Sequence, residues 1–196
     1  MNSDDLFVVY LHGFLSSPAS KKARQTIDYC QQAGMADRLV VPELRGGPAE
    51  SVDQVQGLLD SLQDKQVGLI GSSLGGFYAT CLAERNDLKA VVVNPAVQPY
   101  LRWREYLGEH KNYYSDTTHT VTEQHVRELK NLDMAELKTP ENYLLLAQTG
   151  DEVLDYRLAE GLYQMGTCVI QEGGNHSFEN YGDFLPIIFN FLAIKN

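Results

Sequence analysis

Val67-Gly68-Leu69-Ile70-Gly71-Ser72-Ser73-Leu74-Gly75-Gly76-Phe77-Tyr78-Ala79-Thr80 is the most informative stretch of this 196-residue chain. A short apolar run with β-branched residues enters a Gly-x-Ser-x-Gly turn centred on Ser73, and a helix-compatible segment follows. In that strand–turn–helix context the motif forms a nucleophile elbow, in which the serine hydroxyl projects above a sheet. Gly71 and Gly75 lack a Cβ, so strand and helix can pack closely around the turn. The stretch predicts a nucleophilic serine.

Apolar runs and amphipathic stretches alternate along the rest of the chain. Continuous apolar runs predict strands covered on both faces, and apolar residues spaced by three and four predict helices between them. The expected strands are 6–11, 39–41, 67 to the Ser73 turn, 90–93, 143–147 and 167–170, and the expected helices are 19–33, 51–62, 74–85, 156–165 and 184–194. Right-handed crossovers bring the carboxyl ends of such strands to one edge, where ligands bind. We therefore expect an α/β fold with a parallel sheet of about six strands and helices on both faces.

One segment interrupts the alternation. No strand is expected between about residues 98 and 140, where helical signals occur near 101–107 and 122–132. Because the segment is inserted after a strand end, we expect a small helical cap above the ligand-binding edge. Length and composition are typical of one domain spanning residues 1–196.

A serine hydroxyl needs a base to remove its proton, and the base needs a third group to orient it. In this motif context the partners follow in the order serine, acid, histidine. His176 follows a Gly pair just after the last expected strand, so its imidazole is the expected base for Ser73. Asp151 is the preferred acid and Asp155 the second choice, with a helix N-cap as an alternative role for Asp155. Glu152 is less favoured because its longer side chain starts one position further on.

Two backbone amides are expected to stabilise the oxyanion. Leu74 directly follows the nucleophile, and Phe14 lies in the loop after the first strand. His12 is a candidate for the substrate pocket, although hydrogen bonding within its own loop is the favoured role.

Aromatic and histidine residues gather in the segment expected to be the cap. Tyr100 and Trp103 are candidate pocket residues, and at helical spacing they are equally suited to packing the cap on the body of the protein. His110, His119 and His125 lack the spacing of a metal-binding pair on one helix face and are expected on the surface. The sequence predicts no metal and no cofactor.

The chain carries 16 basic and 26 acidic side chains, a formal net charge of −10. An acidic protein repels a phosphate backbone, so nucleic acid is not an expected partner. The expected partner is a small-molecule acyl ester or thioester. Five basic residues are expected near the ligand-binding edge or in the cap. We expect their side chains to be exposed to solvent, with binding of an anionic leaving group as the alternative; they are Lys21, Lys22, Arg24, Arg102 and Arg104.

Cysteine usage and the amino terminus bear on location. Cys30, Cys81 and Cys168 are odd in number and widely spaced, which argues against a disulfide framework or a zinc site. Cys81 and Cys168 are expected to be buried. No apolar run approaches the length of a membrane span, and residues 1–5 are acidic with no secretory signature. A cytoplasmic location is the expectation.

Five segments together resemble the small bacterial YqiA-type esterases of the α/β-hydrolase superfamily. They are 10–18, 71–80, 91–96, 149–156 and 172–176, in the family's order over nearly the whole chain. The resemblance implies a reduced α/β-hydrolase fold, esterase or thioesterase activity without a cofactor, and Ser73, Asp151 and His176 as the catalytic residues. Two stretches depart from the family pattern, Arg45-Gly46-Gly47 and His110–Val121. Both are expected to flank the pocket, so the resemblance does not indicate which substrate this chain prefers.

The expected reaction is acyl transfer to water through an acyl-enzyme, with activity rising with pH as the base loses its proton. Two alternatives remain open. One is an acyl-CoA thioesterase, which would need local cations. The other is a binding protein that has the hydrolase fold but no catalytic activity.

Overall fold

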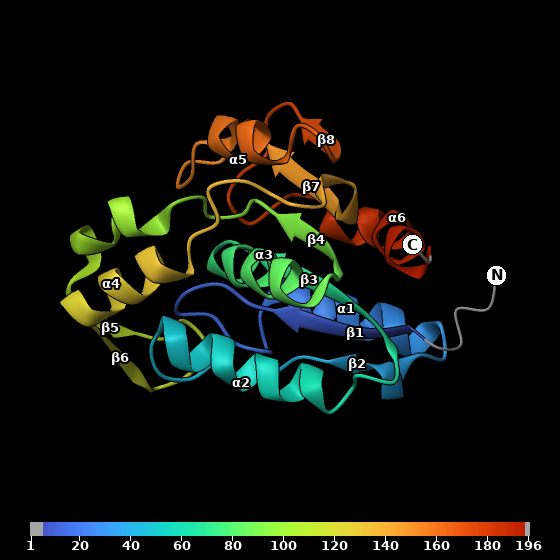
Figure 1. Ribbon diagram of the computed structural model, residues 1–196, viewed down its shortest axis with the longest axis horizontal. Helices are drawn as coiled ribbons and strands as arrows, with labels where there is room; N and C mark the ends of the chain where they lie inside the picture. Colours follow the sequence, from blue (N-terminus) through green and yellow to red (C-terminus); the bar gives the residue numbers. More distant parts are fainter. Residues whose placement is uncertain (1–5, 195–196) are drawn as a thin grey trace.

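The computed structural model describes residues 6–194, in which six strands form one parallel sheet in the order β2-β1-β3-β4-β7-β8 (Figure 1). The strands are β1 (Leu6–Leu11), β2 (Leu39–Val40), β3 (Gln66–Ser72), β4 (Lys89–Val93), β7 (Tyr143–Gln148) and β8 (Thr167–Gln171). Every neighbouring pair in this sheet is parallel. The predicted sheet is confirmed. The acidic stretch 1–5 used for the signal-peptide argument lies outside the described residues.

Helices cover both faces of the sheet, as predicted. They are α1 (Lys21–Gln32), α2 (Pro48–Asp60), α3 (Leu74–Asn86), α5 (Tyr156–Tyr163) and α6 (Tyr181–Ala193). Side chains alternate between two cores along each strand. In β1, Val8 and Tyr10 join the core under α1 and α6, whereas Val9 and Leu11 join the core under α2, α3 and α5.

Two helices begin earlier than the apolar spacing predicts. The second helix begins at Pro48 rather than near residue 51, because proline is favoured in the first helical turn, where its missing N–H leaves no gap in the helix. The last helix begins at Tyr181, three residues before its apolar run. These differences move helix ends and leave the topology unchanged.

The β4–β7 segment, residues 94–142, differs from the expected helical cap. It contains the predicted helix α4 (Glu123–Leu132) and three short 3-10 turns, Pro99–Leu101, Trp103–Tyr106 and Pro140–Asn142, but also an antiparallel hairpin. The hairpin strands are β5 (Gly108–Lys111) and β6 (Thr118–Val121). The expectation of no strand was wrong because most hairpin residues are polar and exposed, so no apolar alternation marks them. In Figure 1 the hairpin and α4 lie together at the left, away from the sheet.

The three cysteines differ in burial. Cys30 and Cys81 are buried free thiols, whereas Cys168 is only half-buried. Over residues 6–194, no helix combines the length and the hydropathy required to cross a membrane.

Candidate active site

Ser73 lies at the sharp turn between β3 and α3. Its backbone has φ +56° and ψ −123°, a conformation that residues other than glycine rarely adopt. Two glycines make room for the turn: a Cβ on Gly71 would collide with the Gly75 carbonyl oxygen, and a Cβ on Gly75 with the Leu11 carbonyl oxygen. The Gly-x-Ser-x-Gly spacing is therefore a steric requirement of this turn.

A chain of hydrogen bonds joins Ser73 to a buried carboxylate. His176 Nε2 lies 3.0 Å from Ser73 Oγ, and His176 Nδ1 lies 2.8 Å from Asp151 Oδ2. The Asp151 side chain is only 2% exposed. Because an ionised carboxylate only accepts hydrogen bonds, Nδ1 donates to it and leaves Nε2 to accept the hydroxyl proton. The arrangement is able to activate a serine hydroxyl.

Asp151 is further fixed by two backbone amides. Its Oδ1 accepts hydrogen bonds of 2.9 and 2.8 Å from the amides of Val153 and Leu154. The turn after β7 thus fixes the position of the carboxylate independently of its contact with the imidazole.

The other two carboxylates considered as the acid have other hydrogen-bond partners. Asp155 caps α5, accepts a hydrogen bond from the Arg157 amide and pairs with the Arg157 guanidinium at 2.8 Å. Glu152 instead accepts a 3.0 Å hydrogen bond from the backbone amide of His176, which lowers the pKa of its carboxyl group. Glu152 therefore contacts the histidine loop but not the imidazole.

Two amide side chains hold the histidine loop, and neither role was predicted from the sequence. Asn94, at the end of β4, donates to the backbone oxygens of Asn175 and His176 at 3.0 and 3.2 Å. It also accepts a 2.9 Å hydrogen bond from the amide of Gln148. The Gln148 side chain in turn accepts a 3.1 Å hydrogen bond from the Asn175 amide. Their position directly after or at the end of a strand was the one available clue.

The loop after β1 passes directly beside Ser73. A Cβ on Gly13 would lie 3.1 Å from Ser73 Cβ, so a larger residue would press on the serine. Phe14 follows in this loop, and Leu74 is the first residue of α3, where the amide has no partner within the helix. Both amides proposed from sequence for the oxyanion thus belong to segments that adjoin Ser73.

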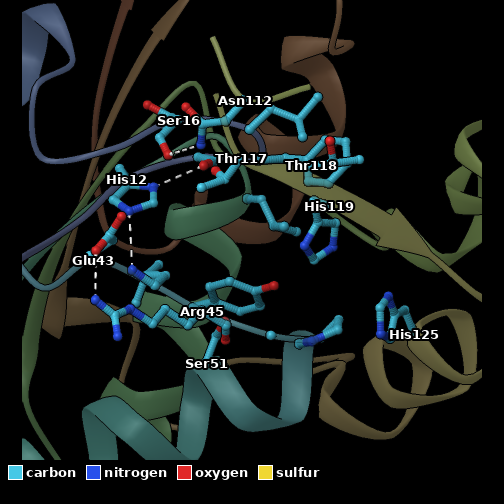
Figure 2. Close-up of a pocket in the computed structure, with 18 of the residues that line it drawn as sticks. His12, Ser16, Glu43, Arg45, Ser51, Asn112, Thr117, Thr118, His119 and His125 are labelled. Atoms are coloured by element: carbon cyan, nitrogen blue, oxygen red, sulfur yellow. Dashed lines mark hydrogen bonds and ion pairs between the residues drawn. The ribbon is translucent and has the colours of Figure 1, made fainter. Parts of the chain in front are cut away.

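His12 is held by its own surroundings. The ring accepts a 3.2 Å hydrogen bond from the Leu44 amide at Nε2 and lies 3.0 Å from the Gly13 carbonyl oxygen at Nδ1 (Figure 2). Since Nε2 accepts, Nδ1 carries the proton and donates. Burial lowers the pKa of this imidazole, so the ring is a neutral part of the loop.

The β5–β6 hairpin is tied to the same loop. The Tyr113 amide donates a 3.0 Å hydrogen bond to the Leu15 carbonyl oxygen, and the Asn112 side chain donates one of 3.0 Å to the Ser16 carbonyl oxygen. The segment inserted after β4 therefore fixes the backbone that carries the Phe14 amide.

Three cavities in the described part of the chain meet at Phe14. The one we call the apolar cavity encloses about 340 Å³, with Ser73 and His176 in its wall. Most of its other lining is aliphatic or aromatic and comes from the β4–β7 segment and the start of α5, for example Ala96, Val97, Leu101, Trp103, Tyr106 and Leu158. Tyr100 is not part of this wall. It packs against the core and contacts Asp133.

The second cavity, which we call the lysine cavity, encloses about 200 Å³ and also contains Ser73 and His176. Lys21 and Lys22 from the start of α1 line it. The Lys22 ammonium donates a 2.9 Å hydrogen bond to the Ser177 carbonyl oxygen. Burial lowers the pKa of Lys22 to about 8, and the nearby Asp151 carboxylate partly opposes this.

The remaining cations considered from sequence are paired or lie apart from the lysine cavity. Arg102 pairs with Glu105 and lines the apolar cavity, and Arg104 pairs with Glu123. Arg24 is exposed on α1.

The third cavity, which we call the polar cavity, encloses about 340 Å³; it shares Phe14, Leu74 and Trp103 with the apolar cavity, but Ser73 does not line it. Figure 2 shows His12, Glu43 and Arg45 on one side of it and His119 and His125 on the other. The surface expectation for His119 and His125 was therefore wrong: both are half-buried, and their ring centres are 5.6 Å apart. His110 is also half-buried and packs against the Phe14 ring. Among residues 6–194, no group of three potential ligands is placed to hold a metal ion.

Residues 7–193 match the family described as "Uncharacterised protein family (UPF0227)". The chain belongs to the UPF0227 family. The UPF0227 protein YcfP of Salmonella paratyphi A is 26% identical over 189 residues, which cover 95% of this chain and 99% of that protein. A UPF0227 protein of Citrobacter koseri matches at the same identity and coverage. The family resemblance inferred from the sequence is confirmed.

Solved structures show the same fold. A putative hydrolase from Agrobacterium vitis S4 superposes with a TM-score of 0.79 at 16% identity, covering 98% of this chain and 90% of that one. Est1E from Butyrivibrio proteoclasticus, solved with ferulic acid bound, gives a TM-score of 0.72 at 10% identity and covers 97% and 89% of the two chains. This UPF0227 protein thus has the α/β-hydrolase fold.

Proposed function

We propose that this protein is a serine hydrolase that cleaves carboxylic esters or thioesters with an apolar acyl group. The observation that carries the proposal is the chain of hydrogen bonds from Asp151 through His176 to Ser73 Oγ, at the wall of an apolar cavity. Est1E and other structural neighbours described as esterases share the fold and are consistent with this chemistry.

In the proposed reaction, Ser73 Oγ attacks the carbonyl carbon while His176 Nε2 takes the hydroxyl proton. Asp151 holds the imidazole in the required tautomer and stabilises its positive charge without taking the proton. The same proton then goes to the leaving alcohol or thiol as its bond to the acyl carbon breaks. Water, activated by His176, hydrolyses the acyl-enzyme and regenerates Ser73.

The negative charge on the carbonyl oxygen needs preorganised donors. The Phe14 and Leu74 amides are our candidates, since one adjoins Ser73 through the β1–α1 loop and the other begins α3. Donors of this type contribute about 10²–10³ in kcat.

The acyl group is assigned to the apolar cavity, because transfer of its methylene groups from water to that lining is favourable by about 0.8 kcal/mol each. We propose that residues 1–196 act as one domain in which the β4–β7 segment serves as the cap. Trp103 from that segment and Leu158 from α5 face the same cavity.

The first test is hydrolysis of nitrophenyl hexanoate by wild type, Ser73→Ala and His176→Ala. Both variants are expected to lose about 10³-fold or more in kcat, as triad knockouts do in other serine hydrolases. A fluorophosphonate probe should label wild type but not Ser73→Ala. Retained turnover in Ser73→Ala would refute the assignment, and a wild type that neither turns over nor labels would indicate a non-catalytic binding protein.

Asp151→Asn and Asp155→Asn form a matched pair in the same assay. Asp151→Asn should lose activity heavily because the imidazole is no longer held in the required tautomer. Asp155→Asn should retain activity, because asparagine caps a helix about as well as aspartate and only the ion pair with Arg157 is lost. The reverse order would transfer the role of the acid to Asp155.

A second candidate is an acyl-CoA thioesterase, which the lysine cavity beside Ser73 favours. Lys22→Gln keeps a hydrogen-bond donor but removes the charge, so it should raise KM for hexanoyl-CoA more than KM for nitrophenyl hexanoate. Lys130→Gln, an exposed lysine on α4, is the control with the same change in net charge. Equal effects of the two variants would argue against this candidate.

A further inference from the structure

Of the three cavities that meet at Phe14, two have both Ser73 and His176 in their walls. An ester bound at Ser73 can therefore extend into two different spaces. The apolar cavity takes the acyl group in the proposed reaction, which leaves the lysine cavity for the alcohol or thiol part of the substrate. The lysine cavity encloses about 200 Å³, room for about six water molecules at liquid density. A leaving group of a few heavy atoms fits inside it.

Lys22 is bonded to the loop that carries the catalytic histidine. Its ammonium group donates a 2.9 Å hydrogen bond to the carbonyl oxygen of Ser177, the residue directly after the base. Since His176 Nε2 passes its proton to the leaving atom, that atom must lie beside the imidazole. A charged group carried by the leaving alcohol close to the ester oxygen can therefore reach Lys22.

The positive charge of the lysine cavity has no counter-charge in contact with it. Within residues 6–194, neither Lys21 nor Lys22 forms an ion pair. The Asp151 carboxylate acts on Lys22 through its charge, but it is already occupied by hydrogen bonds to the imidazole and two backbone amides. The first turn of α1 contains no acidic residue, and the Ser20 side chain does not cap it. The positive end of the helix thus adds to the charge of the lysines.

The Lys22 ammonium is accessible and has donors to spare. The side chain is half-buried, and its hydrogen bond to the Ser177 carbonyl oxygen is open to solvent. An ammonium group has three N–H donors, and this is the one hydrogen bond that it makes within the described part of the chain. Because a charge withdrawn from water is costly unless it is paired, the unpaired ammonium favours an anion as its partner.

We propose that the lysine cavity binds an anionic group, a carboxylate or a phosphate, that the leaving alcohol or thiol carries close to the scissile bond, with Lys22 as its main contact. The proposal rests on the proposed hydrolase function and specifies its substrate, an apolar acyl group joined to a small acidic alcohol or thiol. An acyl-CoA differs from such a substrate because its phosphates lie beyond the pantetheine arm, whereas the charge proposed here is held inside the cavity.

The first experiment compares esters that differ in the charge of the leaving group. Hexanoyl glycolate carries a carboxylate next to the ester, and hexanoyl glycolamide is the neutral match. Wild type should show a kcat/KM about tenfold higher for the glycolate ester, as one hydrogen bond to a charged group supplies. Hexanoyloxyethyl phosphate is the third substrate, and the better of the two anionic esters identifies carboxylate or phosphate as the group recognised. No preference for either anionic ester over the amide would overturn the proposal.

Lys22→Gln and Arg24→Gln are the matched variants, because both remove one positive charge from α1. Arg24 is exposed and does not line the lysine cavity. The quantity measured is the ratio of kcat/KM for the glycolate ester to that for the glycolamide ester, so a general loss from the altered Ser177 contact cancels. Lys22→Gln should lower this ratio about fivefold or more, Lys22→Arg should keep most of it, and Arg24→Gln should leave it unchanged. An equal fall in Lys22→Gln and Arg24→Gln would overturn the proposal, since the overall charge would then set the preference.

Monohexyl succinate reverses the arrangement, with the anion on the acyl part and the apolar chain on the alcohol. Hexanoyl glycolate should be the better substrate of the two. If monohexyl succinate is better and loses that advantage in Lys22→Gln, the lysine cavity holds the acyl part, and the assignment to the leaving group is wrong.

Calorimetry on Ser73→Ala separates this proposal from the hydrolase function. Ser73→Ala should bind hexanoyl glycolate more tightly than hexanoyl glycolamide, and adding Lys22→Gln should remove the difference. If this is found but wild type hydrolyses none of the esters, the hydrolase function fails and the anion site stands. If wild type hydrolyses both esters equally and Ser73→Ala binds both equally, the hydrolase function stands and the anion site fails.

Discussion

Ser73 combines a reactive position with a strained backbone. Its φ of +56° and ψ of −123° cost of order 1–3 kcal/mol for a residue with a Cβ. Glycine adopts this region freely, although it loses about 0.5–1 kcal/mol more conformational entropy on folding. The hydroxyl is therefore presented to the cavities at the expense of stability.

Because of this strain, replacing Ser73 by glycine should raise the stability of the protein while abolishing its activity. Ser73→Gly should be more stable than Ser73→Ala by about 1 kcal/mol, because both variants lack the hydroxyl and only glycine relieves the backbone. Both should be inactive. Urea denaturation of the two variants measures the difference, and an alanine variant as stable as the glycine variant would show that the turn is unstrained.

At the scale of elements, side chains at the ends of two strands hold the loop that carries the catalytic histidine. Asn94 at the end of β4 binds two carbonyl oxygens of the histidine loop, and Gln148 at the end of β7 accepts a hydrogen bond from the Asn175 amide. We assign Asn94 as a positioning residue for His176.

Asn94→Ala should lower kcat by up to about 10²-fold, since a displacement of about 1 Å at a catalytic group has that effect. KM should change little, because Asn94 is not part of the apolar cavity wall. Asn86→Ala is the control, as it removes side-chain hydrogen bonds at the far end of α3. A KM change with unaltered kcat would contradict the positioning role.

Buried elements could be predicted from the sequence, whereas exposed elements could not. Ser73, Asp151 and His176 followed apolar strands, so their order and position could be predicted. Asn94 acts on backbone atoms 81 and 82 residues away, and no local pattern encodes such a contact. The hairpin was missed because its strands are short, polar and exposed. Tyr100 was considered for the pocket on helical spacing, but the backbone there forms two 3-10 turns, which rotate side chains differently from an α-helix.

At the scale of the whole molecule, the lysine cavity concentrates positive charge in a protein of net charge −10. Lys21 and Lys22 occupy the first turn of α1, which contains no acidic residue. The positive end of a helix disfavours cations, so this placement is electrostatically costly.

The lowered pKa of Lys22, about 8, predicts how anion recognition changes with pH. Below that value the ammonium is charged, and it loses its proton as the pH rises through it, while the phosphates of hexanoyl-CoA stay ionised. KM for hexanoyl-CoA should therefore rise between about pH 7 and 9. Initial rates across this range measure it, and nitrophenyl hexanoate corrects for the effects of Asp151, His176 and Lys21. A rise that persists in Lys22→Gln would assign it to another group.

The two hydrogen bonds from the hairpin to the β1–α1 loop bear on how this protein could be altered. Tyr113 and Asn112 hold Leu15 and Ser16, next to Phe14. Anyone who exchanges the hairpin to broaden substrate range would also disturb the loop expected to set the rate. A change in the hairpin that alters substrate selectivity would thus also alter turnover. A grafted hairpin that keeps the Tyr113 and Asn112 hydrogen bonds should change selectivity without lowering turnover.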